Sequence, residues 1–104
     1  MAPYRIDFRE IEWESPVEGI RQKVYQSDKK QIRLVEYSPQ MEPHWCEKGH
    51  YGFILSGRFE IEFDDGTRVF ESGEGVFIPP GKEHRHKGKV FEGTVVALFV
   101  EDLK

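Results

Sequence analysis

The chain has 104 residues, of which 38% are hydrophobic and 33% charged, and its formal net charge is −4 at pH 7. This length favours one domain over residues 1–104, and a domain this small gains stability by pairing with a copy of itself, so we expect a homodimer. The acidic balance excludes a strongly basic nucleic-acid-binding surface, and no apolar run is long enough for a signal peptide or a membrane span, which together predict a cytoplasmic protein.

Alternation with a period of two residues dominates the chain, and no segment has the apolar spacing of a confident helix, so we predict an all-β fold. Residues 4–8 and 11–13 are expected to add an edge strand. Two β-prone runs, residues 20–26 and 31–37, follow, and the polar segment between them is typical of a hairpin-like reversal. On the second of these runs, an outward, solvated Arg33 is favoured over one that lines a pocket beside Tyr37.

The next strands are expected at residues 51–55 and 59–63, and Asp64, Asp65 and Gly66 then form a tight turn into residues 68–70. Short apolar runs at residues 76–78 and 94–100 complete the pattern, the last one buried on both faces or at a dimer interface. Residues 87–89 are predicted to be a solvated loop. Four large side chains are expected to pack in a core away from the chemical site: Trp45, Tyr51, Phe53 and Leu55.

All four histidines and the only cysteine lie beside turn signals in two segments, residues 43–50 and 79–86. If the chain is extended at residues 44–46, His44 and Cys46 share a face and can approach one ion. Imidazole and thiolate donors suit a divalent transition metal such as zinc, iron or nickel and suit magnesium or calcium poorly. The alternative is a polar pocket whose histidines and thiol are hydrogen-bonded or packed.

These segments resemble the two motifs of the cupin family. The first motif corresponds to residues 44–57, with Cys46 where the family has a histidine and His50 where it has a glutamate, and the second corresponds to residues 73–84. The resemblance implies an antiparallel jelly-roll β-barrel, commonly dimeric, that binds a metal inside the barrel. It implies these metal ligands: His44, Cys46, His50 and His84.

Several functions are compatible with this ligand set. Four protein ligands can close a tetrahedron around zinc, the favoured ion, and such a site is structural. Iron, nickel or manganese with open positions would serve an oxygenase or isomerase that acts on a small organic molecule. A metabolite- or metal-sensing module without catalysis is the remaining alternative. His86, two residues beyond His84, is a candidate acid–base residue if the strand is regular, and an ordinary half-exposed histidine otherwise.

Overall fold

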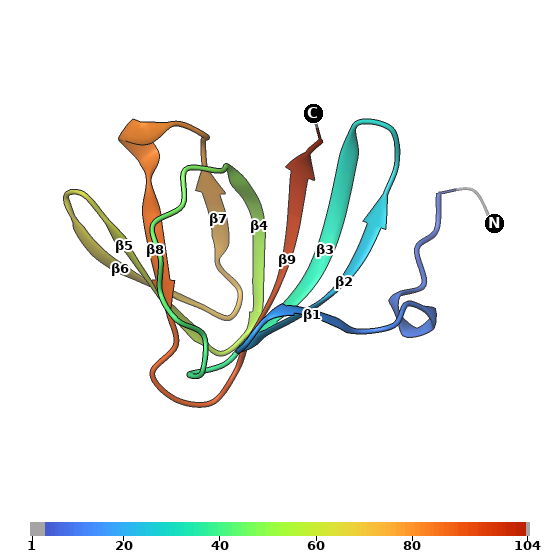
Figure 1. Ribbon diagram of the computed structural model, residues 1–104, viewed down its shortest axis with the longest axis horizontal. Helices are drawn as coiled ribbons and strands as arrows, with labels where there is room; N and C mark the ends of the chain where they lie inside the picture. The colour runs from blue at the N-terminus through green and yellow to red at the C-terminus, as the bar shows by residue number, and fades with distance from the viewer. Residues whose placement is uncertain (1–3, 104) are drawn as a thin grey trace.

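The computed structural model describes residues 4–103, which form two antiparallel sheets packed against each other (Figure 1). The larger sheet contains, in spatial order, β1 (Glu14–Val17), β2 (Ile20–Gln26), β3 (Lys30–Tyr37), β9 (Val95–Asp102), β4 (His50–Ser56) and β7 (Gly75–Ile78). The smaller sheet contains β6 (Gly66–Glu71), β5 (Arg58–Phe63) and β8 (His86–Lys89). Two short 3-10 helices, η1 (Phe8–Glu10) and η2 (Lys82–His84), complete the described elements.

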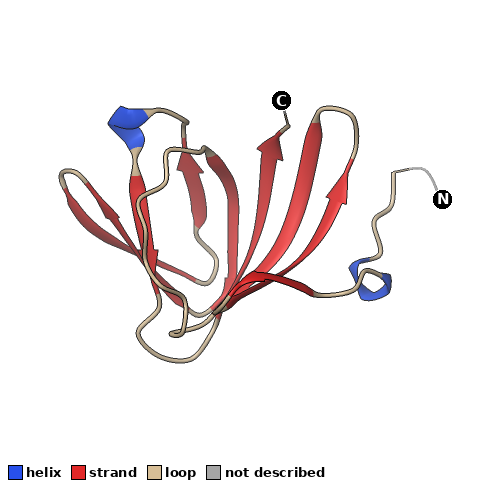
Figure 2. Cartoon of the chain, viewed as in Figure 1, coloured by secondary structure: helices blue, strands red, loops and turns tan. Residues whose placement is uncertain are grey.

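The predicted all-β, antiparallel class is confirmed, and Figure 2 shows strands joined by loops with only two short helical turns. In the described part of the chain, no strand is hydrogen-bonded into both sheets, so a closed barrel is not formed by the strand ladders alone. No helix among residues 4–103 is long and apolar enough to span a membrane.

The core lies between the two sheets and follows the alternation of the strands. Along β9, Val95, Ala97 and Phe99 are buried, whereas the intervening side chains point outward and Val100 is 38% exposed. The same alternation buries Val35 on β3 and Ile54 on β4. Within one chain β9 is therefore buried on one face, so the predicted burial on both faces is wrong; the other alternative from the sequence, a dimer interface, stays a prediction.

The turn that the sequence predicted at residues 64–66 is present, and a second turn at Gly57 joins the two sheets. The β5–β6 hairpin pairs Phe63 with Gly66, so Asp64 and Asp65 form the two-residue loop. Gly57, between β4 and β5, has φ +90°, and a Cβ there would lie 2.2 Å from the Thr94 carbonyl oxygen. Only glycine meets both requirements, which is why the chain can pass from the larger sheet to the smaller one at this point.

The predicted N-terminal edge strand is wrong. The Asp7 side chain accepts a hydrogen bond from the Arg9 backbone N–H at 3.1 Å and begins the 3-10 turn η1. This segment runs beside β2, where Lys23 Nζ donates to the Phe8 carbonyl oxygen at 2.8 Å, and the first strand starts only at Glu14. Local side-chain capping therefore competes successfully with strand pairing here, and β1 pairs only with residues 20–22 of β2.

Two further expectations are corrected. Residues 87–89 belong to β8, which pairs with β5; its charged sequence hides the strand because β8 is an edge strand of the smaller sheet. The predicted core role of Trp45, Phe53 and Leu55 is also wrong, since these side chains are 37%, 44% and 44% exposed. On β4 the inward positions are occupied by Gly52 and Ile54, so the large side chains lie on the outer face of the sheet.

Candidate metal centre

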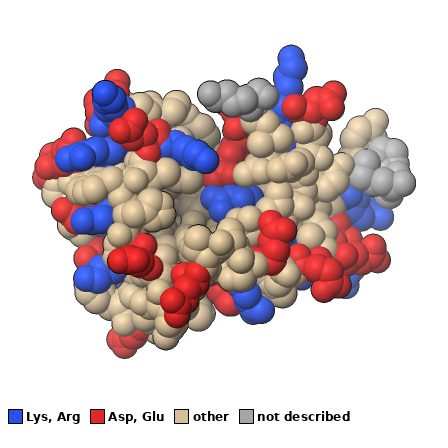
Figure 3. Space-filling view, in the orientation of Figure 1, with Lys and Arg blue, Asp and Glu red and all other residues tan. Residues whose placement is uncertain are grey.

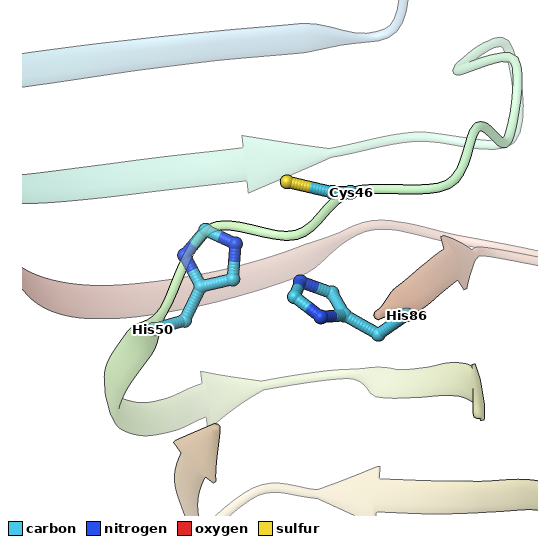
Figure 4. Close-up of side chains that lie close together, drawn as sticks. All are labelled: Cys46, His50 and His86. Carbon is cyan, nitrogen blue, oxygen red and sulfur yellow. The ribbon is translucent and has the colours of Figure 1, made fainter. Parts of the chain in front are cut away.

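Three side chains from separate parts of the chain converge between the sheets. Cys46 lies in the loop before β4, His50 is the first residue of β4, and His86 is the first residue of β8. Cys46 Sγ and one ring nitrogen from each histidine all lie within 4.8 Å of one another. Figure 4 shows the thiol and the two rings gathered around one space. We call these three residues the Cys-His-His cluster.

A backbone bridge holds two of the three residues together. The Cys46 N–H donates to the His86 carbonyl oxygen at 2.8 Å, and the His86 N–H donates to the Cys46 carbonyl oxygen at 2.9 Å. Because both main-chain bonds join the same residue pair, the Cys46 loop is fixed against the start of β8. The distance between the thiol and the imidazole therefore does not depend on flexible side chains alone.

The orientation of His86 leaves one ring nitrogen unused. Its Nδ1 lies 3.0 Å from the His84 carbonyl oxygen, which can only accept, so Nδ1 carries the proton. Its Nε2 is buried and has no hydrogen-bond partner in the part of the chain that is described. Burial is the main cause that lowers the pKa of His86, so the ring stays neutral and Nε2 presents a lone pair to the cluster.

His50 is oriented by a carboxylate. Its Nδ1 lies 3.0 Å from Glu101 Oε2, so Nδ1 donates and Nε2 is the ring nitrogen left for the cluster. Glu101 in turn accepts from Arg33 Nη2 at 2.7 Å and Arg33 Nε at 2.9 Å, and from Gln31 Nε2 at 2.6 Å. A carboxylate behind a histidine in this way is the usual outer support of a metal-binding imidazole.

The Glu101 side chain is ionised at neutral pH. Burial works to raise the pKa of this carboxyl, but hydrogen bonds from His50, Arg33 and Gln31 together with the Arg33 charge lower it to about 2. The Arg33 and Glu101 side chains are only 16% and 13% exposed, so the pair is shielded from solvent. The expectation of an outward, solvated Arg33 is therefore wrong.

A cavity of ≈ 740 Å³ adjoins the Cys-His-His cluster, and all three cluster residues line it. This volume is typical of small-molecule sites, which run from roughly 300 to 1,000 Å³. Figure 3 shows a hollow on this side of the molecule, with acidic and basic side chains interspersed and no broad patch of a single charge. The cluster thus faces a space that an organic molecule can enter.

The structure brings together Cys46 and His50 from the sequence-based ligand set, but it adds His86 instead of the other two histidines. His44 is exposed at the border of the same cavity, close enough that its charge lowers the pKa of His86, but it is outside the cluster. His84 lines a separate cavity of ≈ 420 Å³ near Asp64 and Phe77. His86, expected to carry protons, lies within the cluster.

The 3-10 turn η2 explains why the side chains of His84 and His86 line different cavities. Side chains two residues apart share a face only in an extended strand, and η2 ends at His84 immediately before β8 begins. Glu101 escaped the sequence analysis, although a signal was available. Extending the alternation of Val95, Ala97 and Phe99 by one step places residue 101 on the inner face as well.

The donor set decides what the cluster can bind. Two neutral imidazoles and one thiolate are soft or borderline ligands that select zinc, iron, nickel or copper. Catalytic zinc has three protein ligands, such as three histidines or two cysteines and one histidine, and its fourth position is left for water or substrate; the cluster has the same number and type of donors. The residues therefore fit a transition metal, and the unpartnered His86 Nε2 is the observation that most directly supports this fit.

Comparison with known proteins gives the same fold. The chain matches the cupin domain family over residues 33–101. No curated protein sequence matches it.

Solved structures with the same fold include KdgF from Halomonas sp., with a TM-score of 0.74 and 19% identity over 92% of this chain and 91% of that one. The polyketide cyclase RemF from Streptomyces resistomycificus has a TM-score of 0.76 and 22% identity, covering 96% and 79% of the two chains. A sugar phosphate isomerase from Silicibacter pomeroyi has a TM-score of 0.75 and 15% identity, covering 96% of this chain and 76% of that one. At such identities the likeness is one of fold, and activity has to be argued from the site.

Proposed function

The chain belongs to the cupin domain family, and on that premise we propose that it binds a divalent transition metal at Cys46, His50 and His86 and acts on a small organic molecule in the adjoining cavity. The observation that carries the proposal is the buried, unpartnered Nε2 of His86 facing a thiol and a second imidazole. A buried polar atom without a partner costs stability, and a metal ion removes that cost.

Zinc fits these donors best, because cysteine and two histidines match its usual ligands. A bound divalent ion would polarise a carbonyl or enolate oxygen as a Lewis acid. Zinc has no redox chemistry, so a zinc protein would perform isomerisation or a related proton-transfer reaction, whereas iron would favour an oxygenase. The chain's own part is to hold both imidazoles in the tautomer that exposes Nε2, through the His84 carbonyl and Glu101.

A purely structural metal is less well supported than it was from sequence. That interpretation needed four protein ligands, and the cluster contains three, beside a cavity large enough for a ligand. A sensing module without turnover shares the same site, and steady product formation that is lost in a cluster variant would exclude it as the sole role. In this proposal His86 is a ligand and not a proton carrier, because both of its ring nitrogens are committed.

The decisive experiment is elemental analysis of the protein purified without an affinity tag. We expect about one metal ion per chain in the wild type and little in Cys46→Ala or His86→Ala. The matched control is His84→Ala, which removes an imidazole two residues away that lines another cavity. Equal metal loss in the His84 and His86 variants would contradict the proposed ligand set.

We also propose that the chain forms one jelly-roll domain and pairs with a second copy. Support for pairing comes from an outer apolar patch on the neighbouring strands β7, β4 and β9, formed by Tyr51, Phe53, Leu55, Phe77 and Val100. Phe77 alone is 79% exposed, and contiguous exposed apolar side chains usually mark an interaction surface. A free thiolate ligand suits a reducing compartment such as the cytoplasm.

A further inference from the structure

The cavity beside the Cys-His-His cluster has two chemically different walls. The polar wall comes from β2, β3 and β9 and includes Gln22, Gln31, Arg33, Tyr37, Glu101 and the exposed Asp102. The apolar wall comes from β5, β7 and the loop after β3 and consists of Met41, Phe59, Ile61, Val76 and Ile78, each at most 8% exposed. A molecule in this cavity meets hydrocarbon on one side and hydrogen-bonding groups on the other.

The charges of the polar wall are already paired within the protein. Arg33 directs Nε and Nη2 to Glu101, and its Nη1 donates to Gln22 Oε1 at 2.9 Å. The other basic residue that lines the cavity, Lys48, is exposed. Phosphate groups are usually held by several free arginines, lysines or backbone N–H groups. The cavity offers one exposed lysine for that purpose, so it is poorly equipped for a phosphorylated molecule.

The balance of charge at the cluster favours one anionic group. With a metal bound, the Cys46 thiolate and the Glu101 carboxylate contribute two negative charges, Arg33 contributes one positive charge, and the two coordinating imidazoles are neutral. A divalent ion adds two positive charges, which leaves one positive charge on these inner groups. The other charged residues that line the cavity, Glu42, Lys48 and Asp102, are exposed and screened by solvent, so a ligand with a single anionic group balances the inner charge.

Tyr37 supplies a hydroxyl to the same part of the cavity. It is 8% exposed, and its ring is stacked on Phe59 with centroids 4.7 Å apart, so the phenol is held in place between the two walls. Burial raises the pKa of Tyr37 to about 12, and Tyr37 lines the same cavity as Arg33 and Cys46. A neutral phenol is a good hydrogen-bond donor to an anionic oxygen.

We infer that the cavity takes a small organic molecule with one anionic oxygen group, such as a carboxylate or enolate, and a mainly apolar body. The anionic oxygen lies at the Cys-His-His cluster, where Tyr37 donates a hydrogen bond to it, and the body lies against the apolar wall. This inference rests on the proposed metal site and adds to it the class of molecule bound. It also separates this chain from a protein that acts on sugar phosphates.

The test uses the full chain loaded with cobalt(II), whose absorption reports both the thiolate ligand and any change of ligands. Benzoate, benzamide, acetate and glucose 6-phosphate serve as probes. We expect benzoate to change the visible absorption saturably, with acetate at least about tenfold weaker because it lacks a body for the apolar wall. Benzamide, the neutral isostere, should leave the spectrum unchanged, and glucose 6-phosphate should bind no more tightly than inorganic phosphate.

The variant Tyr37→Phe keeps the ring stacked on Phe59 and removes only the hydroxyl. It should weaken benzoate binding roughly fivefold, the effect of one hydrogen bond, and leave the cobalt spectrum without probe unchanged. If this variant fails to load cobalt, the benzoate and benzamide comparison on the wild type decides by itself.

The results that would overturn the inference differ from those that would overturn the metal site. Equal binding of benzamide and benzoate, or tighter binding of glucose 6-phosphate, contradicts the class of molecule proposed. A cobalt spectrum with a thiolate band that no probe alters leaves the metal site standing and removes the inference. Failure of the wild type to bind cobalt removes both.

Discussion

Residues 43–50 and 79–86 each contain a residue that reaches the Cys-His-His cluster and a histidine that does not. In the first segment Cys46 and His50 reach it, and His44 stays at the cavity border. In the second segment His86 reaches it and His84 faces another cavity. The difference teaches that chemical type and position in a motif are insufficient, because a single turn of 3-10 helix reverses which of two neighbouring histidines points inward.

The largest effect expected from this comparison is on metal affinity. His86→Ala removes a direct ligand and should weaken zinc binding by more than about a hundredfold. Loss of a residue that only supports a ligand already weakens binding by up to about a hundredfold. His84→Ala should change the affinity by less than about threefold, since its carbonyl group, which orients His86, is retained. Competition titration against a zinc-binding dye measures both variants. A larger loss in His84→Ala than in His86→Ala would reverse the comparison.

Glu101→Gln tests the outer support of His50 and comes next in size. It should weaken zinc binding by roughly ten- to a hundredfold and lower the free energy of unfolding by about 3 kcal/mol, because Arg33 is left buried without its carboxylate. The matched control is Glu36→Gln, which breaks an Arg–Glu pair on the same sheet with Arg21, 48% exposed. That change should cost less than about 1 kcal/mol.

Chemical denaturation of both variants, with and without zinc, gives the comparison. Equal losses of stability in the two variants would show that the shielded Arg33–Glu101 pair contributes no more than the exposed Arg21–Glu36 pair.

The pH dependence of the stability of the metal-free protein follows from two groups at the site, the His86 imidazole and the Glu101 carboxyl. The folded-state pKa of His86 lies below its usual 6.5, so the unfolded chain takes up that proton more readily and stability declines as pH falls through this range. Glu101, lowered from 4.5 to about 2, stabilises the fold above pH 4.5, and up to about 3 kcal/mol is lost as pH falls toward 2.

Melting temperatures from pH 7 to pH 2 would record both the His86 step and the Glu101 step. Glu101→Gln should flatten the lower step and leave the upper one, and a stability that rises on acidification would contradict both directions.

The smallest expected effect at the metal site comes from the outer apolar patch, which lies on the opposite face of the sheet. Phe77→Ser should shift a dimer toward monomer in sedimentation velocity and change zinc affinity by less than about twofold. The control Phe91→Ser removes another phenylalanine, 62% exposed, that lies outside this patch. A dimer that persists in Phe77→Ser, or dissociates equally in Phe91→Ser, would place the interface elsewhere.

The sequence by itself determined most of the strands and the chemical character of the site. Alternating burial is a local property of an extended chain, so the strands β2, β3, β5 and β9 could be predicted within a few residues, as could the tight turn at residues 64–66. The presence of soft donors in two separate segments likewise required only residue type, and it predicted a transition-metal site that includes Cys46 and His50.

Only the tertiary structure decided which groups meet. The η2 turn selected His86 over His84, and the pairing of β3 with β9 placed Arg33 against Glu101, 68 residues away, behind His50. Nothing local signals such contacts, because their energy depends on the removal of both charges from water when the two strands come together. For the same reason the outward face of β4 looked like core in the sequence: an alternating apolar strand does not reveal which neighbour covers it.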